Sequence, residues 1–67
     1  KESGRLSDRR LLGVADTALY LGGLGADTVR EMAHGALRSA VVTIPGVRRV
    51  VFDRREIDRL VDGWRAP

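Results

Sequence analysis

Apolar residues in the first half of the chain recur at helical spacing in two short stretches separated by glycines. Residues 14–21 form the first pattern, and the pair Gly22-Gly23 that follows is a typical signal for the end of a helix. A second short helix is expected to start at position 25 or 26 and to run to 34, with Val29 and Met32 facing the core. The first half therefore predicts two helices joined by a tight turn.

Two runs rich in β-branched residues follow, at 41–44 and 48–52. β-branched residues favour strands, and the turn residues Pro45-Gly46-Val47 lie between the two runs. We therefore predict a short antiparallel hairpin with these three residues at its tip. Arg48 and Arg49 come directly after the tip and, in a strand, would point to opposite faces.

The clearest helical pattern is the last one, at residues 53–64. Its first four residues, Asp-Arg-Arg-Glu, have the spacing of a capping box, with Asp as the N-cap. The apolar positions then fall at i, i+3, i+4 and i+7, so they predict one stripe packed on the core. These positions are Ile57, Leu60, Val61 and Trp64.

The chain of 67 residues is short enough for one domain at most. Residues 1–10 show no apolar periodicity and are interpreted as a flexible arm, and residues 11–67 as a domain that is mainly α with a small β-hairpin. The chain has no cysteine, which excludes disulfides and thiolate metal sites and fits a reducing cytoplasm. No apolar run approaches the roughly 20 residues of a membrane span. The polar first ten residues lack a signal peptide, so we expect a cytoplasmic location and no membrane partner.

The positive charge of the chain is concentrated in its first ten residues and in its middle. The net charge is +3 and the isoelectric point is near 10.6, and all basic residues except Lys1 are arginines. Residues 1–10 carry four basic against two acidic residues, and residues 28–52 carry four arginines against Glu31 alone, whereas the charges from residue 53 onward balance. Arginine favours bidentate contacts with phosphates and base edges, so this distribution suits a nucleic-acid partner. Heavy arginine use is also common in small proteins of high-GC organisms, and that explanation stays open.

Short motifs in a fixed order cover about four fifths of the chain. They are Leu-Leu-x-Val at 11–14, Ala-x-Tyr-Leu-Gly at 18–22, Thr-Val-Arg at 28–30, Gly-x-Leu at 35–37, the Val-rich run, Gly-x-Arg-Arg at 46–49, and Asp-Arg-x-x-Ile-Asp-x-Leu at 53–60. This order resembles the excisionase-like, MerR-type winged helix-turn-helix family of DNA-binding proteins. The resemblance implies three helices plus a two-stranded wing, with the second helix in the major groove and the wing on the backbone or minor groove.

The resemblance also implies which residues would contact double-stranded DNA. In the recognition helix they are Asp27, Thr28, Arg30, Glu31 and His34, and in the wing they are Arg48 and Arg49. An acid can accept a hydrogen bond from cytosine and an arginine can read guanine, so a mixed face is workable. Alternatively, Asp27 only favours the start of its helix and Glu31 only faces solvent. The two wing arginines could likewise be edge-strand charges that discourage aggregation.

Catalytic chemistry finds no support in the sequence. His34 has no second histidine, cysteine or acidic cluster near it, so neither a metal site nor acid–base catalysis is indicated. Ser7 and Ser39 have no neighbouring base that would activate a nucleophile. We therefore expect no enzyme activity, no cofactor, no metal and no small-molecule substrate.

The aromatic residues and the arm allow further expectations. The apolar spacing predicts that Trp64 lies in the core and that Tyr20 is partly buried with its hydroxyl at the surface. In the arm, Arg5, Arg9 and Arg10 either reach along the DNA backbone or belong to a solvated tail.

The leading interpretation is a sequence-specific DNA-binding protein that acts as an excisionase, or recombination directionality factor, of a phage or mobile element. It would bind and bend attachment-site DNA to direct an integrase, with further copies of itself on the DNA, in the nucleoid of a bacterial or phage-infected cell. A small transcriptional regulator of the MerR-like class is the alternative. A protein-interaction module that does not use its groove face, motivated by Asp27 and Glu31, and the DNA-binding part of a longer serine recombinase also stay open.

Overall fold

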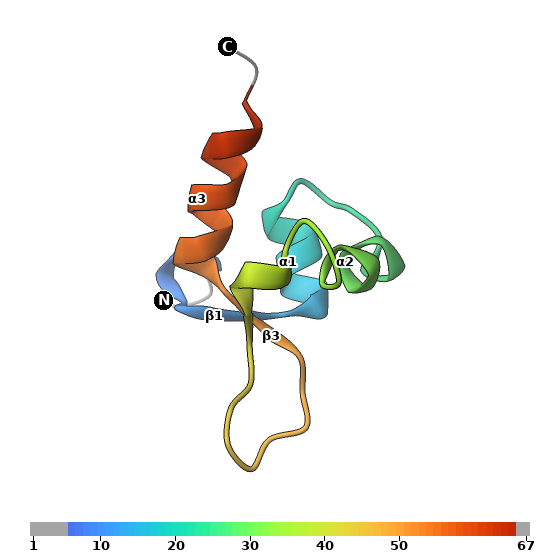
Figure 1. Ribbon diagram of the computed structural model, residues 1–67, viewed down its shortest axis with the longest axis vertical. Coiled ribbons are helices and arrows are strands. Elements are labelled where there is room, and N and C mark those ends of the chain that lie inside the picture. Colours follow the sequence, from blue (N-terminus) through green and yellow to red (C-terminus); the bar gives the residue numbers. More distant parts are fainter. Residues whose placement is uncertain (1–5, 66–67) are drawn as a thin grey trace.

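In the part of the chain that the computed structural model describes, residues 6–65, three α-helices surround a small antiparallel sheet (Figure 1). The helices are α1 (Val14–Tyr20), α2 (Ala26–Met32) and α3 (Arg54–Trp64). The strands are β1 (Leu11–Gly13), β2 (Val41–Val42) and β3 (Val51–Asp53). Two 3-10 turns, η2 (Leu6–Asp8) and η3 (Arg38–Ala40), complete the elements of these residues. This is an α+β arrangement.

The sheet differs from the predicted two-stranded hairpin. Its order is β1-β3-β2, so β3 is central and pairs with both neighbours. Phe52 illustrates this, because it faces Leu12 on one side and Val41 on the other. The prediction missed β1 because a strand of three residues is too short to show an alternating pattern.

The strands of the hairpin are also shorter than predicted. β2 and β3 cover only 41–42 and 51–53, and the eight residues between them form a long loop. Gly46 has a φ of +82°, and the Val47 amide donates to the Ile44 carbonyl oxygen at 3.0 Å. This is the predicted turn, since proline fits its first central position and glycine its left-handed second one. The loop extends away from the helices (Figure 1).

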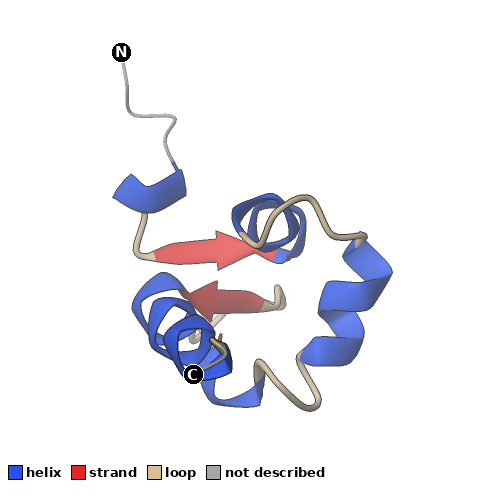
Figure 2. Cartoon of the chain, turned by 90° about the horizontal axis from the view of Figure 1, so that it is seen from above, coloured by secondary structure: helices blue, strands red, loops and turns tan. Residues whose placement is uncertain are grey.

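The core lies between the sheet and the helices. In Figures 1 and 2, α2 and α3 lie on opposite sides of the strands, and one buried cluster fills the space between these elements. Its members come from every layer, so each element depends on the others: Leu12, Ala18, Val29, Leu37, Ala40, Phe52 and Ile57. Phe52 is the largest of the fully buried side chains and belongs to the central strand.

The glycine pair after α1 ends the helix as predicted. Gly22 and Gly23 have φ angles of +105° and +90°, which side chains rarely adopt. The Gly23 amide donates to the Ala18 carbonyl oxygen at 2.8 Å and the Gly22 amide to that of Leu19 at 3.0 Å, the pattern of a Schellman motif. α2 then begins at Ala26 but ends at Met32, two residues earlier than predicted.

The last helix is confirmed in its N-cap and in both its ends, but its last residue is not buried as predicted. The Asp53 carboxylate accepts from the Arg55 amide at 3.0 Å, as an N-cap does. The Glu56 carboxylate, the second member of the predicted capping box, accepts a hydrogen bond from Ser39 Oγ at 2.9 Å. This bond connects η3 to α3. The prediction that Trp64 is a core residue is wrong, since Trp64 is 47% exposed. A helix of 11 residues extends beyond the small body that covers its first turns (Figure 1).

Residues 6–10 make contacts that the interpretation as a flexible arm did not include. Leu6 packs against the core, and Arg9 Nη1 lies 2.7 Å from Asp16 Oδ2. The Arg54 amide donates to the Arg10 carbonyl oxygen at 2.8 Å, which fixes the segment to the start of α3. The first five residues, Arg5 among them, lie outside the described part of the chain.

Candidate nucleic-acid interface

The surface of α2 is divided as the sequence predicts. Val29 is fully buried and Met32 half-buried, so these two anchor the helix to the core. The five residues predicted to contact DNA are all exposed: Asp27, Thr28, Arg30, Glu31 and His34. The first four lie on α2 itself, and His34 lies in the turn just after the helix. The exposed face of α2 is therefore available to a partner.

Asp27 and Arg30 form an ion pair on this face. Arg30 Nη1 lies 3.0 Å from Asp27 Oδ1, and the two side chains are 64% and 99% exposed. Asp27 accepts from no amide as a cap would, because the N-cap of α2 is Gly25 without a side-chain cap. Such an exposed pair contributes at most about 1 kcal/mol, so a phosphate or base could readily displace it.

Arg48 and Arg49 lie in the hairpin loop and not in a strand. Both are exposed, and the prediction that they point to opposite faces of a strand is wrong because β3 begins only at Val51. One terminal nitrogen of Arg49 lies 3.2 Å from the position that a Cβ on Gly13 would occupy. The Arg49 side chain therefore folds back over the end of β1, at the base of the loop.

A groove of about 510 Å³ lies between α2 and the base of the hairpin. The residues that line it come from α2, the turn after it, η3, β2 and the return strand of the loop: Arg30, Ala33, His34, Arg38, Val41 and Val50. The structure thus brings Arg30 and His34 together, whereas the other predicted contact residues lie outside the groove. Arg38 was not among the predicted contacts, and its only signal in the sequence was its membership of the basic middle segment.

The arginines of the described residues fall into a paired and an unpaired set. Those with a carboxylate partner are Arg9, Arg10, Arg30, Arg54, Arg59 and Arg65. No ion pair within residues 6–65 involves Arg38, Arg48, Arg49 or Arg55. All but Arg55 of this second set belong to η3 and the hairpin loop. An exposed guanidinium without a carboxylate partner keeps its full charge for an anion.

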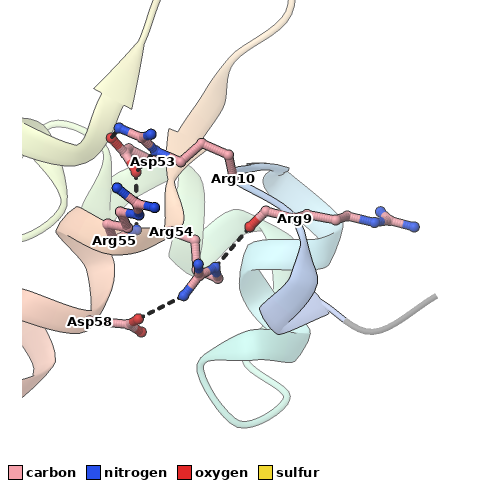
Figure 3. Close-up of polar contacts among 6 residues, drawn as sticks. All are labelled: Arg9, Arg10, Asp53, Arg54, Arg55 and Asp58. Atoms are coloured by element: carbon pink, nitrogen blue, oxygen red, sulfur yellow. Dashed lines mark hydrogen bonds and ion pairs between the residues drawn. The ribbon is translucent and has the colours of Figure 1, made fainter. Parts of the chain in front are cut away.

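The N-terminal segment and α3 form a contrasting network of ion pairs (Figure 3). Arg10 Nε lies 2.9 Å from Asp53 Oδ1, and Arg54 donates from Nε to the Arg9 carbonyl oxygen at 2.8 Å and from Nη1 to Asp58 Oδ2 at 3.0 Å. The hydrogen bond from Arg10 lowers the pKa of Asp53, and the same bond raises the pKa of Arg10. Arg9 and Arg10, which the sequence assigned to a DNA-reaching arm or a solvated tail, are thus held by acids.

A second hollow, between α1 and α3, is acidic. It has a volume of about 460 Å³, and Asp58 and Asp62 line it together with Tyr20. Tyr20 is half-buried, as predicted, and its hydroxyl donates to Asp58 Oδ1 at 2.6 Å. This hydrogen bond, aided by burial, raises the pKa of Tyr20. Arg65 also lines the hollow, so its charged lining consists of two acids and one base, whereas Arg30, His34 and Arg38 line the groove beside α2.

Residues 6–65 contain neither a cluster of metal ligands nor a helix suited to a membrane. No group of three or more His, Cys, Asp or Glu side chains is placed to hold a metal ion there. Within the same residues, no helix combines the length and apolarity that crossing a membrane requires.

Comparisons of the chain with protein-family models, with curated proteins and with solved structures gave no match. The resemblance to the excisionase-like family therefore stays a prediction.

Proposed function

We propose that the protein binds double-stranded DNA as a winged helix-turn-helix domain. In this proposal α1 and α2 are the helix-turn-helix pair, α2 lies in the major groove, and the loop of residues 43–50 is the wing on the backbone or minor groove. The observation that carries the proposal is the set of arginines without a carboxylate partner within residues 6–65. Three of them, Arg38, Arg48 and Arg49, belong to η3 and the hairpin loop, and Arg38 lines the groove beside the exposed, polar face of α2. Neutralising phosphates releases counterions and supplies most non-specific affinity.

The exposed face of α2 would supply the sequence preference. A helix with its side chains is about 10–12 Å in diameter, so α2 can enter a major groove that is about 12 Å wide. Thr28 and Glu31 could contact base edges directly. Arg30 would give up its ion pair with Asp27 and contact a guanine or a phosphate instead. Glu31 would accept a hydrogen bond from a cytosine amine, so it would contribute to sequence preference and not to the strength of DNA binding.

Within this class we propose the role of a recombination directionality factor. A single domain of this size makes few contacts, so useful specificity would come from several copies on adjacent sites or from an integrase partner. This role rests on the resemblance of the sequence motifs. A transcriptional regulator would use the same surface.

The test is a fluorescence titration of labelled duplexes, an attachment-site or upstream fragment of the source genome against a random one, at two salt concentrations. The unchanged protein should prefer the first duplex and lose affinity steeply with salt. Glu31→Ala should reduce the preference and tighten binding to the random duplex, since a negative charge facing DNA is removed. Asp62→Ala, the matched loss of an acid on α3, should change neither. No binding at low salt would refute the proposal and favour a protein-interaction module.

A further inference from the structure

We infer that the groove between α2, η3 and the hairpin receives one sugar-phosphate unit of the DNA backbone, with Arg38 and His34 at the phosphate and Val41 and Val50 against the deoxyribose. The inference rests on the proposed DNA-binding function and names a contact that the sequence did not single out. It makes Arg38 a residue that determines affinity. The other lining residues would then set the fit of the sugar.

The charges around the groove favour an anion. Arg30, His34 and Arg38 line it, and none of the eight acidic residues within residues 6–65 does. Arg30 already pairs with Asp27, whereas Arg38 has no carboxylate partner within residues 6–65. Arg38 is exposed and lies on η3, a short turn fixed at its next residue by the hydrogen bond from Ser39 to Glu56. The backbone that carries Arg38 is therefore held in place before any ligand arrives.

The floor of the groove favours a ligand that is also apolar. Val41 and Val50 are 36% and 48% exposed, although residues of this kind are normally covered. Covering them contributes roughly 25 cal/mol for each Å² removed from water. A nucleotide unit matches both features, because its phosphate is anionic and the faces of its deoxyribose are rich in C–H groups. A base edge matches less well, since the groove offers donors at its rim and no side-chain carboxylate or amide that would accept from a base.

The position of the groove agrees with this occupant. It lies between α2, proposed for the major groove, and the base of the loop proposed as the wing. A strand of DNA that passes from one of these contacts to the other crosses the groove with its backbone. Both the place and the chemistry of the groove thus fit a phosphate and the sugar attached to it.

The variants that test this are Arg38→Gln in the groove and Arg65→Gln as a control with the same loss of charge. Arg65 follows α3, whose end lies at the opposite end of the long axis from the hairpin (Figure 1). The Arg38 side chain makes no hydrogen bond or ion pair with another side chain within the described residues, so R38Q should unfold at the temperature of the unchanged protein. Circular dichroism checks this for both variants.

Binding is then measured on duplexes in which one phosphate at a time is replaced by an uncharged methylphosphonate. For the unchanged protein, one replacement should weaken binding about tenfold, and R38Q should be insensitive to that same replacement because the contact is already lost. R38Q should also lower the slope of log K against log salt by about 0.9, whereas R65Q should not.

A separate variant tests the sugar. Val50→Ser should weaken binding about two- to fivefold and leave the salt slope unchanged, because it removes apolar contact and no charge. If the unchanged protein binds DNA and R38Q behaves as R65Q does, this inference is overturned while the proposed function stands. If the unchanged protein binds no duplex, both are overturned.

Discussion

Most arginines of residues 9–10 and of α3 are held by carboxylates, and these segments are called the paired region. The arginines of η3 and the hairpin loop, called the unpaired region, have no ion pair within residues 6–65. Arg54 and Arg49 show the contrast. Arg54 joins a backbone carbonyl to Asp58, whereas Arg49 makes no ion pair within residues 6–65 and its side chain lies beside Gly13 at the end of β1. Each of these two arginines adds one positive charge to the net charge of the chain. The comparison teaches that pairing, and not the number of arginines, marks the surface available to a partner.

The two regions also differ in what their polar groups do for the fold. The paired region connects residues 9 and 10 to α3, so its charges hold together segments far apart in the sequence. The arginines of η3 and the hairpin loop form no ion pair within residues 6–65, so they join no such segments. Changes in the first region should therefore alter unfolding, and changes in the second should alter DNA binding.

The largest expected effect comes from Phe52, the core residue of the central strand. Phe52→Ala removes the fully buried ring of the central strand and should cost about 3–5 kcal/mol of unfolding free energy. A domain of this size has little more than that to lose, so the variant should be largely unfolded at room temperature. Urea denaturation followed by circular dichroism measures the loss. A cost below about 1 kcal/mol would contradict the placement of Phe52 at the centre of the core.

The next effect separates the two regions by binding. Arg48→Gln with Arg49→Gln should weaken DNA binding at low salt by about 100-fold and lower the salt slope by about two. The matched double variant, Arg59→Gln with Arg65→Gln, removes the same charge from paired positions on α3 and directly after it. It should keep most of the affinity in the same titration. Equal losses in the two double variants would show that only net charge matters.

A smaller effect probes the paired region through Asp53. Asp53→Ala removes the N-cap of α3 and should cost about 1 kcal/mol at pH 7. The pKa of Asp53 is lowered in the folded state, so its contribution is present above the ordinary carboxyl pKa and is lost as the pH falls below about 4. The difference in stability between the unchanged protein and D53A should therefore shrink between pH 5 and 3 in thermal unfolding. A difference independent of pH would contradict the role of the charge.

The smallest effect concerns Tyr20, the sole tyrosine of the chain. Its hydrogen bond to Asp58 raises its pKa, so the phenol should ionise above its ordinary value of about 10 in an absorbance titration. The raised pKa stabilises the fold at neutral pH, and this contribution is lost as the pH rises through the titration. Asp58→Asn should bring the midpoint back toward the ordinary value. An unchanged midpoint would show that the carboxylate is not the cause.

Local signals in the sequence predicted the boundaries that local chemistry sets. The glycine pair after α1, the start of α2, the Pro-Gly turn and the Asp53 cap each depend on neighbouring residues, and the structure confirms all four. β1 escaped prediction because its partner is distant, with Leu11 paired to Asp53. Three residues carry too little pattern to reveal such a pairing.

The candidate site was predicted as a set of exposed residues but not as a shape. The exposure of the α2 face follows from helical periodicity, so Thr28 and Arg30 could be identified in advance. Arg38 could not, because the groove exists only once η3 and the hairpin fold against α2. Trp64 was assigned wrongly to the core, since periodicity does not tell how far the body of the protein extends along a helix.

The central claim is that the unpaired region is the surface that meets DNA. The most direct test is to follow the backbone amide signals of the labelled protein by NMR as a short duplex is added. The account predicts shifts confined to residues 26–34 and 38–50, with the second half of α3 and the acidic hollow unchanged. Shifts centred on Tyr20, Asp58 and Asp62, or no shifts at low salt, would contradict it.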